Sequence, residues 1–156
     1  MKKNRAAVFS LGSFGEVLAR PENYVETDPE VRDAWGIPVL KFNIEWGANE
    51  LAMARDMVET QREMFEAAGI EIMSERTHPL PPGWSIHEEG TARMGNDPKK
   101  SFVTKFNQSH EIKNLFVVDG AAFVSATEKN PTLTLLTLSM RAADYIAEEM
   151  RRGTFG

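Results

Sequence analysis

The 156-residue sequence contains no cysteine. Thiol catalysis, disulfide bonds and thiolate metal sites are therefore excluded, and we expect no metal site of any kind. A net positive charge is also lacking, because 23 acidic residues outnumber 18 lysines and arginines and the formal net charge is −5. A protein that follows nucleic-acid phosphates needs a basic stripe, so we expect no nucleic-acid partner. With 42% hydrophobic residues the chain can form a core, and its length favours one domain or part of a larger protein.

Long apolar runs are missing as well. None is long enough to cross a bilayer, so the sequence predicts no membrane span. The basic start is followed by a short apolar run that Gly12 and Gly15 interrupt. A secretory signal needs a longer apolar core, so we expect no signal peptide in this chain, and either the cytoplasm or the periplasm is compatible with it.

The first half of the sequence predicts strands and one long helix. Alternating or apolar patterns predict strands over 6–11, 37–46 and 70–73, whereas Pro and Asn predict a loop over 20–29. Helical spacing from Asn49 to Ala68 predicts a helix that ends at Gly69. Three prolines in 77–84 predict a connector. We therefore expect a boundary here, between a region 1–84 and a region 85–156.

The second half predicts a buried strand followed by a helix. "LFVVDGAAF" is a continuous apolar run, typical of a strand buried on both faces of a parallel sheet, over 115–118. In "NPTLTLLTLSM", Asn130 suits the N-cap and Pro131 the first helical position. Its leucines surround the helix axis, so the first half of this helix should be buried nearly all round. The expected fold class is α/β, present as an α+β fragment.

Two polar features flank these elements. The strand ends in Asp119-Gly120, and "HEEGTARMG" carries His87, one of three histidines. Strand ends and helix N-termini are where open α/β sheets bind ligands, and a helix N-terminus attracts anions. From the residues alone two interpretations stay open. Many strand–loop–helix units bind nothing, and an isolated histidine is more often structural or exposed than catalytic.

The motifs "HEEGTARMGNDP", "NLFVVDGAAF" and "NPTLTLLTLSMRAADYI", in this order and spacing, resemble the C-terminal part of glucose-methanol-choline (GMC) oxidoreductases. Earlier segments, "FGEVLARPENYVETDP" and "ELAMARDM", are similar to those that precede it in bacterial members. The resemblance implies FAD as cofactor and oxidation of alcohols, often of sugars or glycosides. It also implies part of the substrate domain in 1–84, and the last strand and helix of the FAD-binding domain in 85–156.

By this resemblance, His87 is the active-site histidine and Asn130 the second polar group of the pair. The family's hydride goes to flavin N5, and an imidazole, whose unperturbed pKa is about 6.5, suits the hydroxyl proton. An amide donates to a developing alkoxide while staying uncharged. The resemblance also implies that the following residues lie near the flavin: Asp119, Gly120, Ala121, Asn130, Pro131 and Thr132.

The family's G-x-G-x-x-G turn for the ADP part of the cofactor is absent, and Gly12 and Gly15 are only its nearest approach. The expected partners are therefore an alcohol or sugar substrate and a missing N-terminal FAD-binding half, in the same or a separate chain; an electron-transfer subunit is a further candidate. We expect that the isolated chain does not hold FAD and exposes an apolar patch. Two alternatives stay open, a non-catalytic interaction module that docks a flavin-binding chain and a remnant without function.

Overall fold

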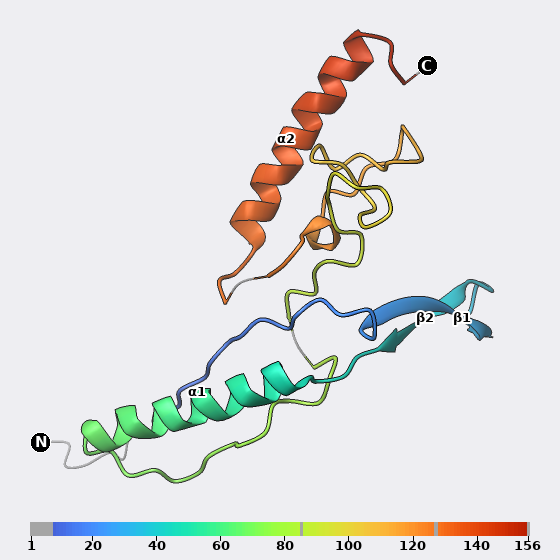
Figure 1. Cartoon of the computed structure of the whole chain (residues 1–156). Coiled ribbons are helices and arrows are strands. Elements are labelled where there is room, and N and C mark those ends of the chain that lie inside the picture. Colours follow the sequence, from blue (N-terminus) through green and yellow to red (C-terminus); the bar gives the residue numbers. More distant parts are fainter. Residues whose placement is uncertain (1–7, 85, 127, 156) are drawn as a thin grey trace, which may run out of the picture. The chain divides into compact units, whose positions relative to one another are not determined.

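The computed structural model describes residues 8–84, 86–126 and 128–155. Their fold is α+β, with a two-stranded antiparallel sheet and two long helices (Figure 1). The chain divides into two units. One comprises the part up to Gly15 together with Gly47–Pro79, and the other comprises Glu16–Trp46 together with Leu80–Gly156.

Strands β1 (Tyr24–Arg32) and β2 (Pro38–Asn43) form an antiparallel hairpin, in which Tyr24 pairs with Asn43. The predicted strand over 37–46 is confirmed. The predicted loop over 20–29 is wrong from Tyr24 onward, because pairing with β2 overrides the local turn residues. The turn residues still affect the hairpin, because its register is irregular between Thr27 and Arg32. There Asp28 Oδ1 accepts the N–H groups of Glu30 and Val31 at 2.8 and 2.9 Å.

Helix α1 (Ala48–Ala67) confirms the predicted helix of the first half. Its first turn is held by the Glu50 carboxylate, which accepts the backbone N–H of Gly47 at 2.7 Å. Gly69 follows the C-cap with φ +66°, the left-handed conformation expected of a helix-terminating glycine.

Two predicted strands of the first half are wrong. Residues 8–11 and 70–73 form no strand; residues 6 and 7 of the first prediction lie outside the described part. A strand needs a neighbour to satisfy its backbone groups, and the only sheet in the described residues is the hairpin. The predicted connector over 77–84 contains no helix or strand, as expected.

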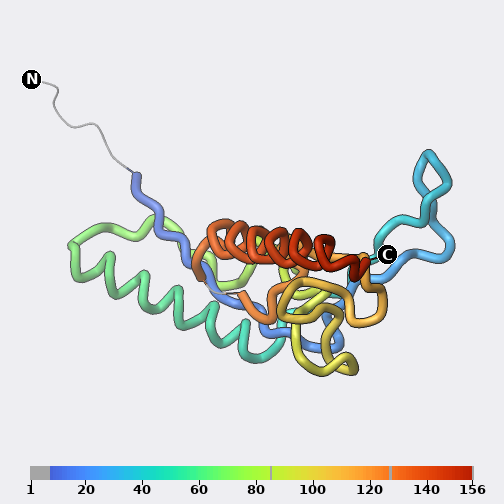
Figure 2. The backbone as a smooth tube through the Cα atoms, turned by 90° about the horizontal axis from the view of Figure 1, so that it is seen from above, coloured from blue at the N-terminus to red at the C-terminus, as the bar shows by residue number. Residues whose placement is uncertain are grey.

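The segment 101–117 folds into loops around buried polar residues and lies along α2 (Thr132–Arg151) (Figures 1 and 2). Phe106 stacks on Tyr145 with ring centroids 4.3 Å apart, and the Tyr145 hydroxyl donates to Gln108 Oε1 at 3.2 Å. Val103 and Ala142 are fully buried. The core of this unit is thus a small apolar centre with a layer of buried polar side chains, those of Asn107, Gln108 and Ser109.

The strand predicted over 115–118 is not formed. Phe116 makes only an isolated bridge to Gln108, and the Val117 N–H donates to the Asn107 carbonyl at 2.9 Å. The α/β class is accordingly corrected to α+β. The apolar run that should lie inside a parallel sheet has no second strand beside it in the described chain, and Leu115 and Val118 are exposed.

Helix α2 also differs from its prediction. Its first half is not buried all round, since Leu133 and Met140 are 78% and 70% exposed. The expectation of an exposed apolar patch is thereby confirmed. Neither long helix of the described residues has the length and apolarity that a membrane crossing requires.

Candidate functional site

Three hydrogen bonds bring the histidine motif to the Asp-Gly motif. The N–H groups of Gly90, Ala92 and Met94 donate to three successive carbonyls, those of Gly120, Ala121 and Ala122, at 3.2, 2.8 and 2.9 Å. The acceptors form a short 3₁₀ turn, η1 (Gly120–Ala122). Two segments that the sequence separates by about thirty residues therefore share one ladder.

His87 lies at the start of this ladder in an unusual backbone conformation. Its φ is +68°, and Gly90 follows with φ +84°. Non-glycine residues seldom adopt positive φ, and such strain gathers at functional sites. The side chain is half-buried. The backbone at His87 is therefore left-handed and not extended, and this sets the direction in which the side chain leaves the main chain.

Asp119 and Gly120 have local structural roles. The Asp119 carboxylate accepts the N–H of Ala121 at 2.9 Å and so caps η1. Gly120 lies so close to the histidine segment that a Cβ atom there would be 3.1 Å from the Glu88 carbonyl oxygen. The Asp-Gly pair therefore fixes the ladder, whatever else it contacts.

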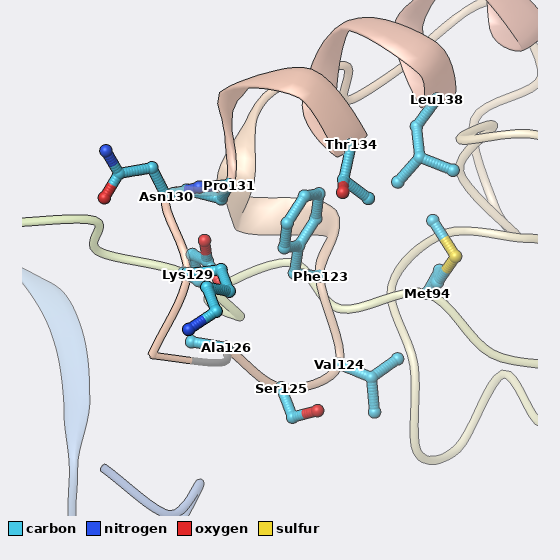
Figure 3. A pocket seen from close by; sticks show the side chains of 11 residues that line it. Met94, Phe123, Val124, Ser125, Ala126, Lys129, Asn130, Pro131, Thr134 and Leu138 are labelled. Atoms are coloured by element: carbon cyan, nitrogen blue, oxygen red, sulfur yellow. The ribbon is translucent and has the colours of Figure 1, made fainter. Parts of the chain in front are cut away.

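The N-terminus of α2 corrects the predicted role of Asn130. The N-cap is Pro131, and no side chain among the described residues caps the helix. Asn130 is exposed, and its carboxamide extends away from Phe123 and Met94 (Figure 3). The reason is positional, since an N-cap side chain must directly precede the helix and Asn130 lies one residue too early. Within the part of the chain that the structure describes, no side chain accepts a hydrogen bond from the first-turn N–H groups from Thr132 onward.

A pocket of about 260 Å³ opens beside this N-terminus (Figure 3). Asn130 and Pro131 line it from the helix side, and Glu89 lines it from the histidine segment. His87, Asp119 and Gly120 are not in its wall. The remaining lining residues are apolar or small side chains and one lysine: Met94, Phe123, Val124, Ser125, Ala126, Lys129, Thr134 and Leu138.

Comparison with known proteins identifies the family. The GMC oxidoreductase model for the C-terminal region matches residues 19–139. The chain belongs to the GMC oxidoreductase family. It is 38% identical over 135 residues to 2-methyl-1,2-propanediol dehydrogenase of Mycolicibacterium austroafricanum, covering 86% of this chain and 24% of that protein. It is 35% identical over 141 residues to the fructose dehydrogenase large subunit of Gluconobacter japonicus, covering 88% and 25%.

A third relative is the gluconate 2-dehydrogenase flavoprotein of Pantoea cypripedii, 30% identical over 146 residues, covering 90% of this chain and 24% of that protein. The chain therefore spans about a quarter of the length of these GMC relatives. Their names are those of enzymes that oxidise alcohols or sugars, and the family uses flavin.

The residues at the pocket fit the flavin of GMC oxidoreductases in one respect. An uncapped helix N-terminus offers N–H groups and a positive dipole end to an anionic group. Asn130, Pro131 and Thr134 border the pocket at that end of the helix. The flavin ring is planar and gains negative charge on reduction, so it suits a surface at the positive end of a helix.

Glu89 is the residue that sequence reasoning missed. Both of its carboxylate oxygens are inaccessible to solvent and have no hydrogen-bond partner in the part of the chain that the structure describes. Burial raises the pKa of this carboxyl, whereas the positive charge of His87 acts to lower it. Its place in the H-x-E-G motif of this GMC chain is the only sequence signal. Burial of an acid cannot be inferred from that motif.

Proposed function

We propose that this chain is the C-terminal portion of an FAD-dependent oxidoreductase that oxidises alcohol groups of sugars, glycosides or related polyols. The observation that carries the proposal is the ladder from Gly90–Met94 to Gly120–Ala122, with the pocket bordered by Asn130 beside it. It supports a single site built from the three motifs that the family shares. The substrate class follows the relatives, whose names include a diol, fructose and gluconate.

His87 and Asn130 act on the substrate hydroxyl in this proposal. His87 accepts the hydroxyl proton, and the Asn130 amide donates a hydrogen bond to the oxygen as its negative charge develops. The chemistry that bound FAD would supply is an acceptor for the hydride of the substrate carbon. Asp119, Gly120, Ala121, Pro131 and Thr132 hold the turn and the helix N-terminus against the cofactor. The dipole of α2 stabilises negative charge there by roughly 0.3–1 kcal/mol.

The division of labour within the chain is part of the proposal. Residues 1–84 contribute to the substrate domain, and 85–156 close the FAD-binding domain with the active-site pair. The missing FAD-binding half lies in the same or a separate chain. The isolated chain holds no FAD, because nothing in it cradles the pyrophosphate in the manner of G-x-G-x-x-G.

Complementation tests this proposal. The chain is co-expressed with the part of the Mycolicibacterium austroafricanum relative that it does not match. Flavin that co-purifies in equal amount with both chains, and is reduced on adding a polyol, is the expected result. Stoichiometric flavin bound to the chain alone after extensive dialysis contradicts the division. Reduction by simple monoalcohols only, with none by polyols or sugars, contradicts the substrate class.

A non-catalytic interaction module is the second candidate, and the exposed apolar side chains of α2 favour it. Such a module docks a flavin-binding chain without acting on substrate. In the complementation experiment it yields a flavin-containing complex whose reduction by substrate does not depend on His87.

A further inference from the structure

Glu89 is a half-buried acid with a shielded carboxylate, and the proposed chemistry does not use it. Both carboxylate oxygens are shielded from solvent and lack a hydrogen-bond partner among the described residues. An ionised carboxylate in such a place is costly, and burial raises the pKa of this one. An acid held in this way beside a cavity points to function. Glu89 contributes to the same pocket wall as Asn130.

The backbone fixes the place of Glu89 beside η1. Gly90, the next residue, donates to the Gly120 carbonyl at 3.2 Å. A Cβ on Gly120 would lie 3.4 Å from Glu89 Cγ, so the turn packs directly against the glutamate stem. Glu89 therefore cannot move away from η1 without breaking the ladder.

The charged groups around Glu89 are few. His87, two residues earlier, acts on the carboxyl with a positive charge, and Glu16 acts on it with a negative charge. Lys129 lines the same pocket, but its ammonium lies 2.9 Å from a Glu128 oxygen. His87 is thus the group whose change of charge during the proposed reaction Glu89 would feel most directly.

We propose that Glu89 is a positioning residue for His87, whose buried negative charge stabilises the imidazolium formed when His87 takes the hydroxyl proton. This inference rests on the proposed function. In that step the substrate O–H bond breaks and an N–H bond forms on the imidazole, while the carbon's hydride passes to bound flavin. Glu89 neither gains nor loses a proton. A fixed charge without a competing partner acts at full strength, because nothing must reorganise as the imidazolium appears.

The first experiment measures the coupling without flavin. The carboxyl carbon of Glu89 is titrated by ¹³C NMR in the whole chain and in His87→Gln. Because the positive charge of His87 lowers the pKa of Glu89, that pKa is expected to rise in the variant. An unchanged Glu89 titration overturns the inference. The result does not depend on whether the enzyme is assembled.

The second experiment measures flavin reduction by stopped-flow in the complemented enzyme. Glu89→Gln is expected to lower the limiting rate by about tenfold and to move the acidic limb of the pH profile about one unit lower, as loss of a nearby opposite charge does. Glu89→Asp keeps the negative charge, so the acidic limb of its pH profile should lie at the same pH as in the parent enzyme. Glu88→Gln is the matched control, since Glu88 is the exposed neighbour.

These outcomes separate the two claims. A Glu89→Gln enzyme with the parent rate and pH profile overturns the role of Glu89 and leaves the role of His87 intact. A His87→Ala enzyme that reduces flavin at the parent rate overturns the proposed function itself. If Glu89→Gln fails to assemble, the NMR titration of the His87→Gln chain still decides whether the two groups interact.

Discussion

The backbone N–H of Gly90 donates to the carbonyl oxygen of Gly120 across 3.2 Å, and this bond joins the histidine motif to the Asp-Gly motif. It requires a close approach. A Cβ on Gly120 would come within 3.1 Å of the Glu88 carbonyl oxygen, a backbone atom that cannot easily give way. Glycine is needed at 120 because two main chains meet there.

Gly120→Ala should therefore lower the free energy of unfolding by about 1–3 kcal/mol, the usual cost of forcing an atom into a packed site. Gly12→Ala is the matched control, since a Cβ at Gly12 meets nothing within 4 Å. It should change stability by no more than about 0.5 kcal/mol. Urea denaturation followed by circular dichroism measures both variants. Equal stability of the two variants would show that the approach is not tight.

Local periodicity was sufficient where the pattern lies within one segment. Helix α1 could be predicted because its apolar spacing and Gly69 lie in one segment. Strand β2 could be predicted from its alternation. Strand β1 could not, because its residues Pro29 and Asp28 suggest a turn and only the pairing with β2 makes it a strand.

The motifs themselves were found from sequence, but their geometry was not. The ladder between the two motifs depends on contacts about thirty residues apart, which no local pattern encodes. The prediction of a buried strand over 115–118 was wrong, because a strand needs neighbours that the described chain does not supply for this run. Leu115 and Val118 are exposed, whereas the Phe116 ring packs on Tyr145 and Phe155. The roles of His87 and Asn130 stay predictions.

Asn130 offers a test that separates capping from catalysis. Because Asn130 does not cap α2, Asn130→Ala should change the free energy of unfolding by no more than about 0.5 kcal/mol. Asp119 does cap η1, so Asp119→Ala should cost about 0.5–2 kcal/mol. Thermal melts of the two variants provide the comparison.

In the complemented enzyme Asn130→Asp should reduce its flavin much more slowly than the parent. A carboxylate there repels both the developing alkoxide and the anionic reduced flavin, whereas an amide donates to the alkoxide. Flavin reduction by the Asp variant at the parent rate, measured by stopped-flow, would remove Asn130 from the reaction. A large loss of stability in Asn130→Ala would instead restore the capping role.

His87→Ala should slow flavin reduction by about 10²–10⁴-fold, the usual contribution of a positioned general base. FAD content should change little, because His87 is not expected to hold the cofactor. His78→Ala is the control, since His78 lies in the proline-rich connector of the other unit. Stopped-flow reduction and flavin absorbance give the two readouts. An unaffected rate in His87→Ala means that another group takes the proton.

Glu89 should make stability depend on pH. Burial raises its pKa in the folded chain above the ordinary carboxyl value, so an unfolded chain ionises first as pH rises. The contribution of Glu89 to the free energy of unfolding should be fully present at pH values below the ordinary carboxyl pKa. It should be lost as pH rises through the raised pKa that Glu89 has in the folded chain. Glu89→Gln should lack this loss and be more stable than the parent at pH 7. Urea denaturation across this range, with Glu88→Gln as control, tests the sign.

Helix α2 carries an apolar stripe that the described chain leaves uncovered. Its members are spaced three and four residues apart and all are exposed: Leu133, Leu136, Met140, Ala143, Ala147 and Met150. This is the spacing of a helix face that packs against a partner. The fully buried Ala142 lies on the other side, against the polar core. The stripe is therefore additional to the packing of the helix within its own unit.

If the missing FAD-binding half covers this stripe, Met140→Glu should leave the unfolding of the isolated chain nearly unchanged, because Met140 is 70% exposed. It should prevent co-purification with that half, because a carboxylate would be buried without a partner. Asp144→Lys, an exposed charge change on the same helix, should not prevent it. Ala142→Glu should instead unfold the isolated chain. Normal assembly of Met140→Glu would show that the stripe faces solvent, and the second half must then dock elsewhere.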